Sequence, residues 1–172
     1  MRFIATATAS DATDAEWRER VALHRARRPA SWLTVETTEL ADLLRAHTPD
    51  DPPLLIDCLT LWLAGVMEQR GLWAAHATAA TAETRDAELR VVVDALLDAW
   101  RGTRGRVVAV SNEVGSGVVP EYPSGRRFRD ELGTLNARLA AECDEVLIVE
   151  AGIARSLLTG RPAVTRANRS EY

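Results

Sequence analysis

The chain of 172 residues contains no lysine, and all 21 of its basic residues are arginines. This absence excludes a Schiff-base nucleophile, and it excludes the lysine with which a Walker A loop holds the β and γ phosphates of a nucleotide. The formal net charge of -4 also argues against a dedicated nucleic-acid-binding protein. The absence of lysine therefore removes whole catalytic mechanisms from consideration.

Cysteine and long apolar runs are scarce as well. The two cysteines, Cys58 and Cys143, match neither a disulfide framework nor a zinc pattern, and we expect them to be core thiols. The longest apolar stretch, residues 54–67, is interrupted by Asp57 and Thr60 and is too short to span a bilayer. With 47% hydrophobic and 27% charged residues, the sequence predicts one cytoplasmic domain over residues 1–172.

What the sequence does contain is an alternation of short apolar runs and longer amphipathic segments. The short runs predict strands at residues 2–6, 32–36, 54–58, 106–111 and 145–150, and the longer segments predict helices at 14–28, 38–46, 59–70, 83–100 and 126–143. Residues 74–82 have no clear period and are interpreted as an insertion. This order predicts an α/β fold, with a mainly parallel sheet covered by helices on both faces.

Ligands of parallel sheets bind at the carboxyl ends of the strands. The residues that follow the predicted strands are Ala5–Ala7, Glu36, Asp57, Ser111–Glu113 and Glu150. Asp57 has the position of a magnesium ligand, and equally that of a residue that caps the next helix. The glycine-rich segment 111–121 is typical of a loop that approaches a ligand closely, but it is neither a Walker A nor a dinucleotide motif.

His24 stands near the end of the first predicted helix and is followed by Arg25, Arg27 and Arg28. An imidazole beside guanidinium groups can attack phosphorus while the cations neutralise the phosphate oxygens. The spacing alone favours the simpler interpretation, a solvated basic helix end.

Several blocks in order carry a more specific signal: Phe3–Ala7, Glu19–Pro29, Trp32–Glu36, Asp57–Leu63, Ser111–Pro120 and Arg127–Asn136. Together they resemble the bifunctional adenosylcobinamide kinase and adenosylcobinamide-phosphate guanylyltransferase family of cobalamin biosynthesis, from the first strand to about Ile153. The resemblance implies a P-loop NTPase (RecA-like) fold. It also implies a homo-oligomer, specifically a trimer.

By this resemblance, the family phosphorylates adenosylcobinamide with GTP or ATP. It then transfers GMP from GTP to adenosylcobinamide phosphate through a GMP-histidine, giving adenosylcobinamide-GDP and pyrophosphate. His24 occupies the position of the catalytic histidine. The positions that match nucleotide contacts are Ala5, Thr6, Ala7, Arg25, Ala26, Arg27, Arg28, Glu36 and Asp57, and Asp57 is the expected Mg²⁺ ligand.

One departure stands beside these matches. The family places a strand and a Gly-x-x-x-x-Gly-Lys-Ser loop before the strand that opens this sequence, and a sequence without lysine does not contain that loop. A start codon assigned too far downstream, a shortened chain and a degenerate paralogue are the explanations, and we favour the first because the sequence opens inside the predicted sheet. The alternative function is a non-catalytic remnant that keeps the fold but has neither activity.

Overall fold

The computed structural model describes residues 1–7, 15–73 and 79–157. Its elements are β1 (Arg2–Ala5), α1 (Ala15–Ala26), β2 (Leu33–Glu36), α2 (Leu40–Ala46), β3 (Leu54–Asp57), α3 (Leu59–Gln69), α4 (Ala79–Gly102), β4 (Val107–Val110), α5 (Pro123–Glu142), β5 (Leu147–Glu150) and β6 (Ile153–Ser156). Within this part of the chain, no helix is both long and apolar enough to cross a membrane.

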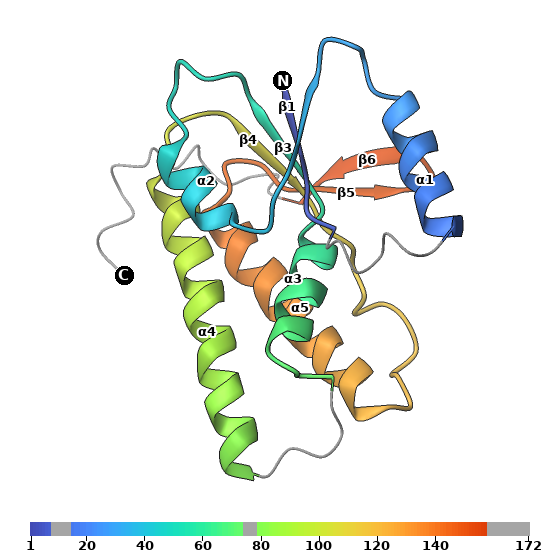
Figure 1. Ribbon diagram of the computed structural model, residues 1–172, viewed down its shortest axis with the longest axis vertical. Helices are drawn as coiled ribbons and strands as arrows, with labels where there is room; N and C mark the ends of the chain where they lie inside the picture. Colours follow the sequence, from blue (N-terminus) through green and yellow to red (C-terminus); the bar gives the residue numbers. More distant parts are fainter. Residues whose placement is uncertain (8–14, 74–78, 158–172) are drawn as a thin grey trace.

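Four of the strands form one parallel sheet in the order β2-β1-β3-β4 (Figure 1). β1 lies inside the sheet, and its Ile4 is opposite both Val35 of β2 and Ile56 of β3. Strands that are buried in this way need apolar side chains on both faces, which is why their sequences are nearly continuous apolar runs. The parallel α/β architecture predicted from the sequence is confirmed.

The two faces of the sheet have different coverings. Ile4, Leu54 and Ile56 are fully buried and share one core with side chains of α2, α3, α4 and α5. Phe3 points to the opposite face, because neighbouring residues of a strand alternate between faces. There its ring contacts His24 of α1, a helix without fully buried residues. The main core therefore lies on one face, and α1 covers the other face at β1.

The fifth predicted strand does not join the parallel sheet, so that part of the prediction is wrong. β5 instead pairs antiparallel with β6, which the sequence did not predict, in a separate two-stranded sheet. The antiparallel pairing follows from the link between β5 and β6, where Ala151 and Gly152 have φ of 51° and 77°. Two successive positive φ values form the tight turn of a hairpin.

Two more differences concern α4 and the loop before α5. α4 begins at Ala79, inside the segment that was interpreted as an insertion, while residues 74–78 of that segment lie outside the described residues. α5 begins at Pro123, a residue type that suits the first turn of a helix.

Within residues 1–7, 15–73 and 79–157, β4 pairs with β3 and has no partner on its other side. Val108 and Val110 on one of its faces are 56% and 41% exposed. Apolar side chains of the hairpin are exposed too, among them Leu147 and Val149. Of the predicted core thiols, Cys58 is buried and Cys143 is half-buried, and neither forms a disulfide.

The turn that contains Thr48 and Asp51 lies at the amino ends of the strands. The Asp51 carboxylate accepts hydrogen bonds from the backbone N–H and the hydroxyl of Thr48, at 3.0 and 2.8 Å, and these bonds hold the pKa of Asp51 below its ordinary value. Arg2 pairs with the same carboxylate at 3.0 Å. His47 is buried next to this turn, and a Cβ on Gly105 would lie 2.2 Å from its Nε2 atom. Any other residue at position 105 would require His47 or the Thr48 carbonyl to shift.

Candidate active site

The candidate site lies at the carboxyl ends of β1, β2 and β3. Ala5 is in register with Glu36 on one side and with Asp57 on the other, so the strand-end residues named from the sequence are neighbours. Beside them is a cavity of about 440 Å³, a size typical of small-molecule sites. It is lined by Phe3, Ala5, Ala7, Trp17, Arg18, Val21, His24, Arg28, Glu36, Asp57 and Leu61.

His24 is the centre of the polar cluster in this cavity. An NH2 nitrogen of Arg28 lies 3.3 Å from Nδ1 of the imidazole, and Oδ2 of Asp57 lies 3.6 Å from Nε2. The Phe3 ring meets the imidazole edge to face, with centroids 5.7 Å apart. The His24 side chain is 52% exposed, so a ligand in the cavity can reach it.

Arg28 is the arginine that the fold brings to His24. Its guanidinium carbon lies 3.3 Å from the centroid of the Phe3 ring, and its NH1 nitrogen donates a hydrogen bond to the Thr34 hydroxyl at 3.1 Å. Burial lowers the pKa of Arg28, and the nearby Asp57 carboxylate opposes that shift. An arginine remains cationic under such shifts. The site therefore holds a fixed positive charge beside the imidazole.

The other arginines of the predicted cluster are placed differently. Arg25, Ala26 and Arg27 are exposed and do not line the cavity. The simple interpretation of a solvated basic helix end describes these residues, whereas His24 and Arg28 face the strand ends.

Thr6 is also placed apart from the cavity wall. It is fully buried, and its hydroxyl donates to the carbonyl oxygen of Cys58 at 2.7 Å and accepts from the backbone N–H of Cys58 at 3.0 Å. This pair of bonds ties the end of β1 to the end of β3. Thr6 thus holds the backbone next to Asp57 in place.

Asp57 does not act as a helix cap. The N-cap of α3 is Cys58, and no side-chain hydrogen bond caps it. The Asp57 carboxylate instead faces the cavity, one quarter exposed and close to His24. Among the described residues no group of three or more His, Cys, Asp or Glu could hold a metal ion. Mg²⁺ usually takes one or two carboxylates together with substrate phosphates and water, so Asp57 fits a magnesium that arrives with a nucleotide.

Sequence reasoning missed five lining residues: Phe3, Trp17, Arg18, Val21 and Leu61. Trp17 and Val21 could have been found from their helical spacing to His24 and Arg28. Trp17, Val21, His24 and Arg28 follow one another at intervals of four, three and four residues, which places them on one face of a helix and its end.

The glycine-rich loop that was singled out in the sequence is ordered by hydrogen bonds. The Asn112 N–H donates to the Thr60 hydroxyl at 3.0 Å, and the Asn136 amide donates to the Asn112 carbonyl at 3.1 Å. Ser111 donates to Asn136 at 2.7 Å. Glu150, in contrast, belongs to the hairpin and pairs with Arg155 at 2.8 Å, so it is not part of the sheet edge where Asp57 lies.

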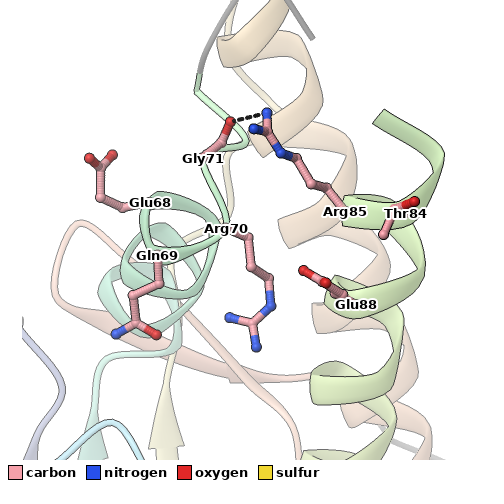
Figure 2. A pocket seen from close by; sticks show the side chains of 7 residues that line it. All are labelled: Glu68, Gln69, Arg70, Gly71, Thr84, Arg85 and Glu88. Carbon is pink, nitrogen blue, oxygen red and sulfur yellow. Dashed lines mark hydrogen bonds between the residues drawn. The ribbon is translucent and has the colours of Figure 1, made fainter. Parts of the chain in front are cut away.

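A second cavity, of about 720 Å³, lies between the end of α3 and α4 (Figure 2). Arg70 and Arg85 line it, but each guanidinium already donates to a backbone carbonyl, of Val66 and Gly71 respectively. Figure 2 shows two acidic residues of the lining on different helices, Glu68 on α3 and Glu88 on α4. Among the described residues, no histidine or cysteine lines this cavity, and none of the lining residues belongs to a strand.

Comparison with known sequences agrees with the geometry. Residues 1–157 match the family described as cobinamide kinase / cobinamide phosphate guanyltransferase. The chain belongs to this family. Its α/β fold is therefore of the P-loop NTPase type, and its function lies in cobalamin biosynthesis, in cobinamide phosphorylation and guanylyl transfer. The resemblance inferred from the sequence is confirmed.

Curated relatives are similar over most of the chain. The bifunctional adenosylcobalamin biosynthesis protein CobP of Pseudomonas aeruginosa is 39% identical over 152 residues, which are 88% of this chain and 78% of the relative. The proteins named CobU of Salmonella typhimurium and Escherichia coli are 35% and 32% identical over 158 residues, which are 88% of this chain and 82% of each relative.

Proposed function

We propose that this family member transfers GMP from GTP to adenosylcobinamide phosphate through a covalent GMP-histidine on His24, and that the same domain phosphorylates adenosylcobinamide. The observation that carries the proposal is the meeting of His24, Arg28 and Asp57 in one cavity at the strand ends. A nucleophile, a fixed cation and a carboxylate suited to magnesium are the groups that this chemistry needs.

The residues of the cavity have different proposed roles, which follow from their charges. His24 supplies a nitrogen lone pair to the α-phosphorus, and Arg28 neutralises the charge that develops on the phosphate oxygens. Ala5 and Ala7 leave room at the strand ends, and Glu36 supplies an acceptor for nucleotide hydroxyl or amino groups. Asp57 would hold Mg²⁺, which when bound neutralises phosphate charge. Positioning and neutralisation then account for catalysis, because phosphoryl and nucleotidyl transfer require little proton chemistry from the protein.

The test is covalent labelling. In a version extended with the family's glycine-rich lysine loop, GTP labelled at the α-phosphate should leave label on the protein through an acid-labile, base-stable bond, as expected for a phosphoramidate, and His24→Ala should abolish it. His47→Ala and His76→Ala are the matched controls and should keep the label. His47 lies at the amino ends of the strands, next to Gly105, which is the opposite edge of the sheet from the cavity. Label that persists in His24→Ala and disappears in a control variant would refute the assignment.

The magnesium role is tested separately. Asp57→Asn keeps the size of the side chain and removes its charge, so in the version extended with the family's glycine-rich lysine loop it should weaken magnesium-dependent binding of GTP measured by calorimetry. Unchanged affinity and unchanged magnesium dependence would contradict this role.

Two expectations from the family remain to be measured. Because the sequence has no lysine, we expect labelling of the 172-residue chain to be weak, and a version extended with the family's glycine-rich lysine loop to label more strongly. Equal labelling of the two chains would refute a role for that loop. The expected trimer is tested by light scattering coupled to gel filtration, where a monomer at all concentrations would refute it.

A further inference from the structure

The imidazole of His24 is held at both of its ring nitrogens. Arg28 faces Nδ1 at 3.3 Å, and Asp57 faces Nε2 at 3.6 Å. A guanidinium has only donors, so Nδ1 must present its lone pair to Arg28. A carboxylate has only acceptors, so Nε2 carries the ring proton on the side of Asp57. The partners of the two nitrogens thus select one neutral tautomer.

Both partners are themselves fixed. Arg28 is held between the face of Phe3 and the hydroxyl of Thr34. Asp57 is the last residue of β3, hydrogen-bonded into the middle of the sheet. Rotation of the imidazole that exchanged Nδ1 and Nε2 would break both contacts and bring the ring N–H against a cation. The ring orientation is therefore set by residues of β1, β2 and β3.

We propose that Nδ1 of His24, not Nε2, is the atom that becomes bonded to GMP, and that Asp57 is a positioning residue that holds the Nε2–H tautomer. This inference rests on the proposed function, which makes His24 the nucleophile. It adds the identity of the reacting atom and a role for Asp57 that requires no metal.

In the proposed first step, a bond forms at Nδ1 of His24 and one bond of GTP breaks. The Nδ1 lone pair forms a bond to the α-phosphorus of GTP, and the bond from that phosphorus to the bridging oxygen breaks. The electron pair of the broken bond leaves with pyrophosphate. Because Nε2 keeps its proton, the imidazole ring gains a positive charge, and the Asp57 carboxylate lies where it stabilises that charge.

The return step uses the same groups. A phosphate oxygen of adenosylcobinamide phosphate attacks the phosphorus, and the N–P electron pair returns to Nδ1. Arg28 touches Nδ1 in the free protein, so its guanidinium is next to the phosphate oxygens in both steps. Its donors can pass from the lone pair to those oxygens without a large movement.

The first experiment reads the tautomer without metal or nucleotide. The full chain is labelled with ¹⁵N-histidine, and long-range proton–nitrogen spectra are recorded above the titration range of histidine, with His24→Ala identifying the His24 signals. We expect the Nε2–H pattern in the wild type and a changed Nε2 shift in Asp57→Asn. Asp42→Asn, which removes an exposed carboxylate of α2, should leave the His24 signals unchanged. An Nδ1–H pattern in the wild type, or no effect of Asp57→Asn, would overturn the inference.

The second experiment identifies the bond. After reaction with GTP of a ¹⁵N-histidine-labelled chain extended with the family's glycine-rich lysine loop, the ³¹P–¹⁵N coupling should connect phosphorus to Nδ1. Asp57→Asn should slow adduct formation by roughly a hundredfold, whereas Asp42→Asn should not. An adduct on Nε2 overturns this inference alone. Absence of any adduct on His24 overturns the proposed function, and the tautomer spectra still report on the ring.

Discussion

Replacement of Thr6 by valine should destabilise the protein at the point where the core meets the site. Valine has nearly the same shape as threonine, so the change removes the hydroxyl and leaves no cavity. The Thr6 hydroxyl makes two buried hydrogen bonds, accepting from the Cys58 N–H at 3.0 Å and donating to the Cys58 carbonyl at 2.7 Å. The expected loss of unfolding free energy therefore depends on whether the Cys58 N–H and the Cys58 carbonyl each keep another hydrogen-bond partner.

The two partners differ. The Cys58 carbonyl keeps a second donor, the N–H of Trp62 at 3.1 Å, so it loses only a net bond of about 0.5–1.5 kcal/mol. The Cys58 N–H becomes an unpaired buried donor, which costs about 1–3 kcal/mol. Thr6→Val should therefore lower the free energy of unfolding by about 2–4 kcal/mol.

Thr6→Ser is the matched control. It keeps the hydroxyl and removes only a buried methyl group, for a cost of about 1 kcal/mol. The assay is urea unfolding followed by tryptophan fluorescence, since the chain has five tryptophans. With a slope of about 2 kcal/mol per molar urea, the midpoint of Thr6→Val should fall by about 1–2 M and that of Thr6→Ser by about half a molar. Equal midpoints for the two variants would show that the hydroxyl contributes nothing.

Three further outcomes are expected. Gly105→Ala forces a Cβ against the buried His47 ring and a backbone oxygen, and it should cost about 1–3 kcal/mol of unfolding free energy. Gly102→Ala is the control, because a Cβ there meets nothing within 4 Å and should not destabilise the protein. Equal thermal midpoints for the two variants would contradict this expectation. Asp51 accepts hydrogen bonds within its turn, and these bonds keep its pKa low. The Asp51 carboxylate therefore stabilises the folded protein above the pKa of the unfolded state, and this stabilisation is lost as pH falls through the pKa of the folded state. Acid unfolding of Asp51→Asn should therefore lose part of its pH dependence and that of Asp50→Asn should not, and two identical acid-unfolding profiles would argue against it. Val108→Lys on the open strand β4 should reduce concentration-dependent association in light scattering, and unchanged association would show that this edge is not involved.

Some features followed from the sequence by itself. Apolar runs located β1, β3 and β4, and the alternating pattern of residues 32–36 located β2. The rule that ligands bind at carboxyl ends then selected Ala5, Glu36 and Asp57, which the register places side by side. These inferences succeed because they need only local pattern and the common direction of parallel strands.

The hairpin shows where local pattern was insufficient. Residues 147–150 are as apolar as the other strands, and nothing in that run distinguishes a parallel neighbour from an antiparallel one. The antiparallel pairing of residues 147–150 is determined by the positive φ values at Ala151 and Gly152, which reverse the direction of the chain in a tight turn. An alanine in this conformation gives no clear warning in the sequence.

The composition of the site also depended on the tertiary structure. The sequence presents His24, Arg25, Arg27 and Arg28 as one basic cluster, but only His24 and Arg28 line the cavity. Thr6 looks like a contact residue in the sequence, but it is turned inward and bonded to Cys58. A sequence establishes which side chains share a helix face or a strand end, whereas the packing of α1 over Phe3 establishes which of them meet Asp57. That packing is set by contacts between residues far apart in the chain, and no local pattern records them.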